Sequence, residues 1–415
     1  MNKPQFPQSA ALFTRAEQVI PCGIYGHTTP AMLVPGKFPY YAKCSYGTRY
    51  LDVDDNEYLD WLCGYGAVVL GHQHADVEAA VLQAQHQVLC ANHPTPIMVE
   101  LAEYLVDLID FAAWAVFGKN GSDMTTWALQ VARDHTKRNK ILKVQHSYHG
   151  IDPWCTPGHA GLIQEDTVHI HDFIWNDLGS FEDQIKRYAN QIAAVIISPF
   201  HHPAFAKSEL PEPNFLQHIE QICRRDGIIL ILDDIRAGFR LHHGGSHRYF
   251  NFTPDIICLA KALANGHPLS AALGSKELRI AASRVFLTGS YWYNQAPMAA
   301  ALACLNILDK TNAVTKMQFL GERLMQGLVA AASEYGYTAI TSGPAALPLL
   351  TFENDPGLNL QQWFCVEMVR RGIFLHPHHN WFISAAHSIQ DVDHTIATAI
   401  EVFKLQAFIH EKSMP

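Results

Sequence analysis

The segment Ile228-Ile229-Leu230-Ile231-Leu232-Asp233-Asp234 carries the strongest indication of the fold in this sequence. It is an apolar run of strand length that ends in two carboxylates. A run that is apolar at every position is typical of a strand buried on both faces of a parallel sheet. Ligands of open α/β sheets bind at the carboxyl ends of such strands. Asp233 therefore has two interpretations: it caps the turn that follows, or it belongs to a binding site.

A second apolar run, Ile256-Ile257-Cys258-Leu259-Ala260, ends in Lys261 and precedes a turn-rich segment. A lysine at this edge of the sheet is badly placed for a core and well placed for an amine nucleophile. Pyridoxal 5'-phosphate (PLP) needs an amine that forms a Schiff base with its aldehyde and a carboxylate beside its pyridine nitrogen. We predict that PLP is the cofactor and that Lys261 and Asp233 are the catalytic residues in these two roles.

The segments around these runs alternate between strand and helix patterns. Strands are predicted at 194–197, 228–232 and 256–259, and helices at 214–225 and 296–308. The alternation predicts an α/β fold, a large domain whose mainly parallel sheet is covered by helices.

Both ends of the chain read as parts of a smaller α+β domain. Residues 48–53 and 57–61 form a turn-linked strand pair, and the last hundred residues again alternate helix and strand. We expect three segments: 1–70 and 311–415 in the small domain, and 71–310 as the large PLP-binding domain.

Composition excludes several classes of protein. A formal charge of −9 without a basic stripe argues against a nucleic-acid partner. Nine scattered cysteines without a CxxC pair argue against a disulfide framework and a thiolate metal site. The first residues lack the apolar core of a signal peptide, and no stretch is long and apolar enough for a membrane helix. These features predict a cytoplasmic protein without a membrane partner.

A phosphate site is predicted at Gly118-Lys119-Asn120-Gly121-Ser122-Asp123, which leads into a helical pattern at 124–136. Free N–H groups at the start of a helix bind phosphate without requiring a cation. The alternative is an ordinary helix cap, since Ser and Asp are favoured there.

An aromatic ring is predicted at another strand end, where Tyr148-His149-Gly150 follows the strand-like residues 140–144. Tyr148 is placed to stack on the face of the pyridine ring. A tyrosine of the core is the alternative.

These segments together resemble the class III aminotransferases of PLP fold type I, particularly the branch that includes glutamate-1-semialdehyde aminomutase. The resemblance is carried by residues 50–60, 71–74, 120–123, 148–150, 232–240 and 259–261. It implies a homodimer with shared active sites. It also implies seven cofactor contacts: Lys261 in the Schiff base, Asp233 at the pyridinium, Ile235 and Tyr148 on the two ring faces, Gly121 and Ser122 at the phosphate, and Ser290 reaching the phosphate of the neighbouring subunit.

The implied activity is that of an aminotransferase. Such an enzyme moves an amino group between an amine or amino acid, α or non-α, and a keto acid or aldehyde. An aminomutase or epimerase that acts within one substrate molecule is the alternative. A binding subunit without activity is a third interpretation, against which the presence of Lys261, Asp233, Tyr148 and Ser122 together argues.

The sequence departs from the aminomutase branch in ways that bear on the substrate. Residues 21–30, PCGIYGHTTP, lack the arginine expected to bind a substrate carboxylate, which argues against glutamate semialdehyde. Ser198 stands where relatives have a glutamate. The aromatic run Tyr291-Trp292-Tyr293 has two interpretations, packing against a partner subunit or narrowing the pocket.

Charged and histidine-rich segments leave further options open. Arg236 and Arg240 each have two interpretations: a member of a surface ion pair, which we favour, or a group that binds a substrate carboxylate. The clusters 242–247 and 376–379 lie in Gly- or Pro-containing loops without Cys or Glu ligands, so no metal site is predicted. His27, His146 and His376 are candidates for lining the substrate pocket.

Overall fold

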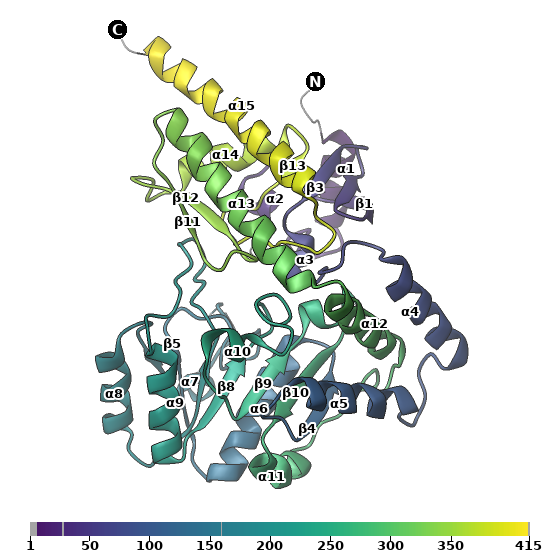
Figure 1. Cartoon of the computed structure of the whole chain (residues 1–415), viewed down its shortest axis with the longest axis vertical. Coiled ribbons are helices and arrows are strands. Elements are labelled where there is room, and N and C mark those ends of the chain that lie inside the picture. The colour runs from purple at the N-terminus through teal and green to yellow at the C-terminus, as the bar shows by residue number, and fades with distance from the viewer. Residues whose placement is uncertain (1–5, 27–28, 159, 414–415) are drawn as a thin grey trace. The chain divides into compact units, whose positions relative to one another are not determined.

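The computed structural model describes residues 6–26, 29–158 and 160–413 and divides the chain into two compact units (Figure 1). One unit contains the described parts of Met1–His74, Ala204–Ser208 and Thr315–Pro415. The other contains those of Ala75–Pro203 and Glu209–Val314. The predicted boundaries after residues 70 and 310 remain a prediction.

The second unit is built on a seven-stranded sheet with the strand order β4-β10-β9-β8-β7-β5-β6. Neighbours from β9 to β6 pair in parallel, whereas β10 pairs antiparallel with β9 and β4. The mainly parallel α/β sheet is therefore confirmed. Its strands are β4 (Trp114–Gly118), β5 (Lys140–Val144), β6 (Ile170–Phe173), β7 (Ile192–Ile197), β8 (Ile229–Asp233), β9 (Ile256–Leu259) and β10 (Ser270–Gly274).

The central strands are buried on both faces, as their unbroken apolar sequences predict. Every residue of β7, β8 and β9 is buried. Side chains along a strand alternate between faces. Ile229 and Ile231 belong to the core cluster that includes side chains of α6, so Leu230 and Leu232 face the opposite layer.

Helices cover this sheet. The helix α6 contacts five of the strands, and α8 and α9 contact β6 and β8 respectively. The helices are α4 (Ala75–Gln87), α5 (Pro96–Leu108), α6 (Gly121–Thr136), α7 (Gln164–Thr167), α8 (Leu178–Arg187), α9 (Phe215–Asp226), α10 (Ser246–Phe250), α11 (Arg279–Arg284) and α12 (Ala296–Lys310), with short 3-10 turns η1 (Lys261–Ala264) and η2 (Lys276–Leu278).

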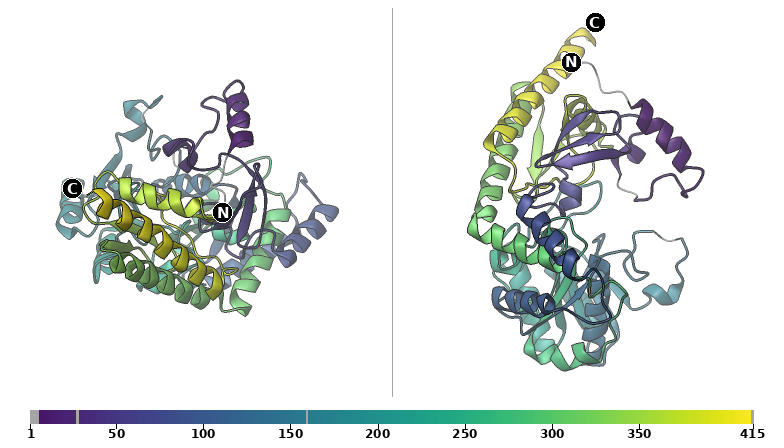
Figure 2. Two further views of the ribbon diagram at one scale, coloured as in Figure 1. Left: turned by 90° about the horizontal axis from the view of Figure 1, so that it is seen from above. Right: turned by 90° about the vertical axis from the view of Figure 1, so that its right-hand side faces the viewer.

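The first unit combines a four-stranded sheet, a two-stranded sheet and several helices. The larger sheet has the order β1-β2-β3-β13, and α14 packs against α15 (Figure 2). The elements are α1 (Pro7–Ala16), α2 (Pro30–Leu33), β1 (Ala42–Tyr46), β2 (Arg49–Asp52), β3 (Glu57–Asp60), α3 (Cys63–Gly66), α13 (Ala313–Glu334), β11 (Ala339–Ser342), β12 (Leu349–Phe352), α14 (Asn359–Val369), β13 (Ile373–Phe374) and α15 (Ile389–Ser413).

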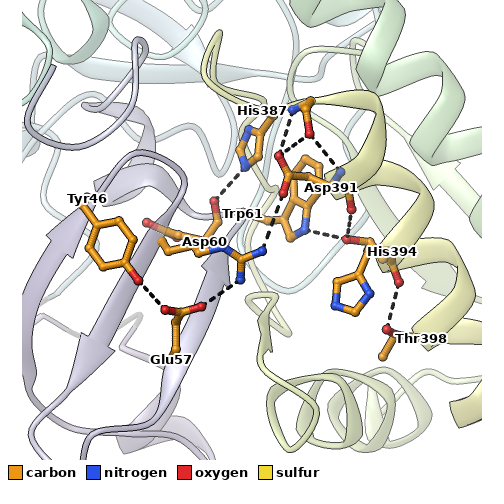
Figure 3. Close-up of polar contacts among 11 residues, drawn as sticks. Tyr46, Glu57, Asp60, Trp61, His387, Asp391, His394 and Thr398 are labelled. Atoms are coloured by element: carbon orange, nitrogen blue, oxygen red, sulfur yellow. Dashed lines mark hydrogen bonds and ion pairs between the residues drawn. The ribbon is translucent and has the colours of Figure 1, made fainter.

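A buried polar network joins β3 to the segment that leads into α15 (Figure 3). The Trp61 indole stacks on His387 with ring centroids 4.1 Å apart and donates to Thr395 Oγ1 at 3.1 Å. The Nδ1 atom of His387 accepts from the Ser384 N–H at 2.9 Å, so Nε2 carries the proton and donates to the Asp60 carbonyl at 3.1 Å. Burial lowers the pKa of His387 to about 4, which keeps the imidazole neutral.

Acidification from pH 6.5 to about pH 4 is expected to reduce the free energy of unfolding. In that interval the unfolded chain protonates His387 near its ordinary pKa while the folded imidazole stays neutral. The loss is on the order of 3 kcal/mol. Calorimetric melting of a His387→Gln variant should show a shallower pH dependence than wild type. His394→Gln, which replaces an exposed histidine of α15, is the matched control. Identical slopes for both variants would contradict this role.

Candidate active site

The predicted catalytic pair lies at the carboxyl ends of two adjacent parallel strands. Asp233 is the last residue of β8 and is paired in register with Cys258 of β9. Lys261 begins the turn η1, just after β9 ends at Leu259. Because both strands are buried and run the same way, their ends deliver the carboxylate and the amine to one edge of the sheet.

Asp233 is buried and forms hydrogen bonds to a histidine and to its own turn. Its Oδ2 lies 2.7 Å from His149 Nδ1, and its Oδ1 accepts from the Ile235 N–H at 3.3 Å. The second bond shows that Asp233 does cap its turn. The bond to His149 fixes the other carboxylate oxygen, and the His149 imidazole is completely buried. Its Nε2 atom has no hydrogen-bond partner within residues 6–26, 29–158 and 160–413.

Lys261 carries the most perturbed amine of the site. Burial lowers its pKa to about 7, with a further lowering by the charge of Arg236 and an opposing effect of Asp233. A substantial fraction of Lys261 is therefore a free amine at neutral pH, as a nucleophile or base requires. Its backbone has φ +46°, a left-handed conformation that is uncommon for a side-chain-bearing residue and is concentrated at functional sites.

The start of α6 meets the turn after β8 at very short range. A Cβ placed on Gly121 would lie 2.5 Å from Ile235 Cδ1, so a larger residue here would require the Ile235 side chain to shift. A Cβ on Gly150 would lie 2.4 Å from Ser122 Oγ, which itself accepts from the Ile151 N–H at 3.1 Å. Bare backbone at the positive end of a 16-residue helix is suited to an anion such as phosphate.

Tyr148 and His149 enter this site from the loop after β5. Tyr148 is 39% exposed, so the interpretation as a core tyrosine is wrong. The carbonyl of its neighbour His149 accepts from Thr125 Oγ1 of α6 at 2.8 Å, which fastens the loop to the helix. The structure thus brings Gly121, Ser122, Tyr148, the Asp233–Ile235 turn and Lys261 into one region of the second unit, and their contacts to a cofactor remain a prediction.

Ser290 is not joined to this cluster by any contact among the residues that the structure describes. It is exposed, and its carbonyl accepts from the Cys90 thiol at 3.3 Å. Its neighbours Tyr291 and Tyr293 are 66% and 39% exposed.

The contact of His149 with Asp233 and the burial of Arg240 could not be seen in the sequence. His149 was visible in the Tyr-His-Gly motif, but only the tertiary structure shows its bond to Asp233. Arg240 is completely buried, so its interpretation as part of a surface ion pair is wrong. Arg236 lies beside Asp233 and Tyr148, and burial lowers its pKa to about 10.

The histidine-rich segments serve other contacts. His247 Nε2 lies 3.0 Å from Asp110 Oδ1, and His378 Nε2 lies 2.9 Å from Gln362 Nε2. Among the residues that the structure describes, no group of three or more His, Cys, Asp or Glu side chains is arranged to hold a metal ion. Of the pocket candidates, His27 lies outside the described residues.

Comparison with known proteins identifies the family. The family described as aminotransferase class III matches residues 34–406. An aminopentol aminotransferase from Sphingopyxis macrogoltabida is 38% identical over 389 residues, covering 94% of this chain and 92% of the relative. A 3-aminobutyryl-CoA aminotransferase from Cloacimonas acidaminovorans is 31% identical over 400 residues, covering 95% and 96%.

Comparison with a solved structure supports the same family. The FumI protein of Sphingopyxis sp. MTA144, in its PLP internal aldimine form, superimposes with a TM-score of 0.94 at 37% identity, covering 98% of each chain. The chain belongs to the class III aminotransferases.

This class III aminotransferase uses PLP, and the residues of the site fit that cofactor. The buried carboxylate of Asp233 suits a pyridine nitrogen, and the backbone N–H groups at the start of α6 suit a phosphate. When bound, PLP supplies an electron sink for the carbon that loses a proton. The resemblance stated from the sequence, the fold type and the enzyme class are therefore confirmed.

Asp233→Asn is expected to lower the rate of amino transfer by about 100-fold or more, because the amide removes the negative charge while still accepting from His149.

The matched control is Asp234→Asn. Asp234 is buried, its carboxylate accepts from Ser246 N and Oγ, and burial raises its pKa to about 7. This variant should lose about 1–2 kcal/mol of stability and keep its rate. Single-turnover rates and thermal melts measure both; equal losses of rate in the two variants would refute the assignment.

Proposed function

We propose that Lys261 is the residue that binds PLP covalently and moves the substrate proton, with Asp233 holding the pyridine nitrogen protonated. The observation that carries this proposal is the joint position of the two groups at the ends of β8 and β9. The lowered pKa of Lys261 supports it, because a free amine can accept a proton from the substrate carbon at neutral pH. Tyr148, Ile235, Gly121 and Ser122 are proposed to position the cofactor ring and phosphate.

We further propose that the donor is an amine whose amino group is not α to a carboxylate. The segment 21–30 offers no arginine for such a carboxylate. The relative named for 3-aminobutyryl-CoA acts on a compound with its amino group on carbon 3, and the relative named for aminopentol is also an amine aminotransferase by name. A donor of this kind is consistent with both features.

A homodimer with shared active sites completes the proposal. Phe286, Tyr291 and Tyr293 are exposed in the single chain, with Phe286 at 83%. Apolar and aromatic side chains of this kind are enriched in the buried cores of subunit interfaces. A second copy that covers them would place its Ser290 near the phosphate of the first, as the resemblance implies.

A cytoplasmic location is also proposed. All nine cysteines are free thiols, as expected for a reducing compartment. Across the described ranges, no helix has both the length and the apolar character needed to span a membrane.

The test is the visible spectrum of the purified enzyme while α-amino acids, β-amino acids and simple amines are added without a keto acid. The cofactor band should disappear with a β-amino acid or simple amine and return when pyruvate is added. Lys261→Ala should abolish turnover, whereas Lys276→Ala, at an exposed lysine of η2, should not.

Three outcomes would contradict parts of the proposal. Bleaching by α-amino acids alone would overturn the proposed donor class. A band that persists with every amine would favour an aminomutase or epimerase, and turnover by the Lys261→Ala variant would refute the role of Lys261.

A further inference from the structure

Lys119 occupies the turn between β4 and α6, two residues before the helix begins at Gly121. The backbone of this turn is fixed by one carboxylate, because Asp123 Oδ2 accepts from the N–H groups of Lys119 at 2.9 Å and Asn120 at 2.7 Å. The side-chain amine of Lys119, unlike its backbone N–H, is not bonded to this carboxylate. Its Nζ is buried and forms no hydrogen bond with any residue that the structure describes.

A buried ammonium group without a hydrogen-bond acceptor is energetically unfavourable. Burial of an ammonium group without an acceptor destabilises the charged form, and burial accordingly lowers the pKa of Lys119. The nearby Cys90 and the carboxylate of Asp123 oppose this lowering of the pKa, but Asp123 Oδ2 already accepts from two backbone N–H groups. An anion supplied from outside the chain would remove the cost by accepting from the amine.

The position of Lys119 indicates which anion. Its turn opens the helix whose first residue, Gly121, presents bare backbone beside Ile235. A helix start favours an anion, and the phosphate of PLP offers three strong acceptor oxygens. We propose that Lys119 is a cofactor-binding residue whose ammonium group binds the PLP phosphate. The sequence predicted a phosphate site formed by helix N–H groups alone, and Lys119 adds a positive charge to it. This inference rests on the proposed function.

The experiment compares PLP with pyridoxal, which has the same ring and aldehyde but no phosphate. The dissociation constants of both are measured by fluorescence titration of the full-length cofactor-free chain. The variants are Lys119→Met, which removes the charge, and Lys119→Arg, which keeps it. Lys137→Met is the matched control, because Lys137 follows the other end of α6, is exposed and pairs with Asp134 at 2.7 Å.

Lys119→Met should weaken PLP about 10- to 100-fold, the value of one charge-assisted hydrogen bond, and leave pyridoxal within about twofold of wild type. Lys119→Arg should bind PLP more tightly than Lys119→Met does, and Lys137→Met should match wild type. Equal weakening of PLP and pyridoxal, or no weakening of either, overturns the inference. If Lys119→Met does not fold, Lys119→Gln provides the same comparison.

Failure of the proposed function gives a different result. In that case the wild-type chain itself forms no covalent complex with PLP that depends on Lys261. A wild-type chain that binds PLP through Lys261 but shows no phosphate dependence on Lys119 contradicts this inference alone.

Discussion

The parallel pairing of β8 with β9 is the constraint on which the site depends. Because Asp233 pairs in register with Cys258, the carboxylate at the end of one strand and the amine just beyond the next reach the same edge of the sheet. A shift of one residue in this register would turn the Asp233 side chain to the other face. The same shift would move each side chain of β8 into the opposite layer, whose close packing fits the side chains that are there now.

Close packing then fixes the remaining groups around this pair. The bond from His149 to Asp233 ties the loop after β5 to the end of β8. Glycines at 121 and 150 let the start of α6 approach both the Ile235 side chain and the loop that carries Tyr148. The same burial that holds these elements together lowers the pKa of Lys261, so the fold and the reactivity of the amine have one physical cause.

Much of this was predictable from the sequence. Unbroken apolar runs predicted β7, β8 and β9 to within two residues at each end, because strands buried on both faces leave a strong signal. The sequence also showed that Asp233 and Lys261 are polar residues at the ends of apolar strands. The partner of Asp233 was not, since His149 and Asp233 are far apart in the chain and only the order of strands brings them together. The complete burial of Arg240 escaped prediction for the same reason: sequence does not show which turn residues the tertiary fold covers.

Chemical mapping shows whether Lys261 is the residue that carries the cofactor. Borohydride reduction of the purified enzyme makes the bond between PLP and its lysine permanent, and mass spectrometry of the digested chain then locates the modified residue. We expect a phosphopyridoxyl group on the peptide that contains Lys261. Modification confined to another lysine, such as Lys119 or Lys143, would rule out Lys261 as the residue that binds PLP.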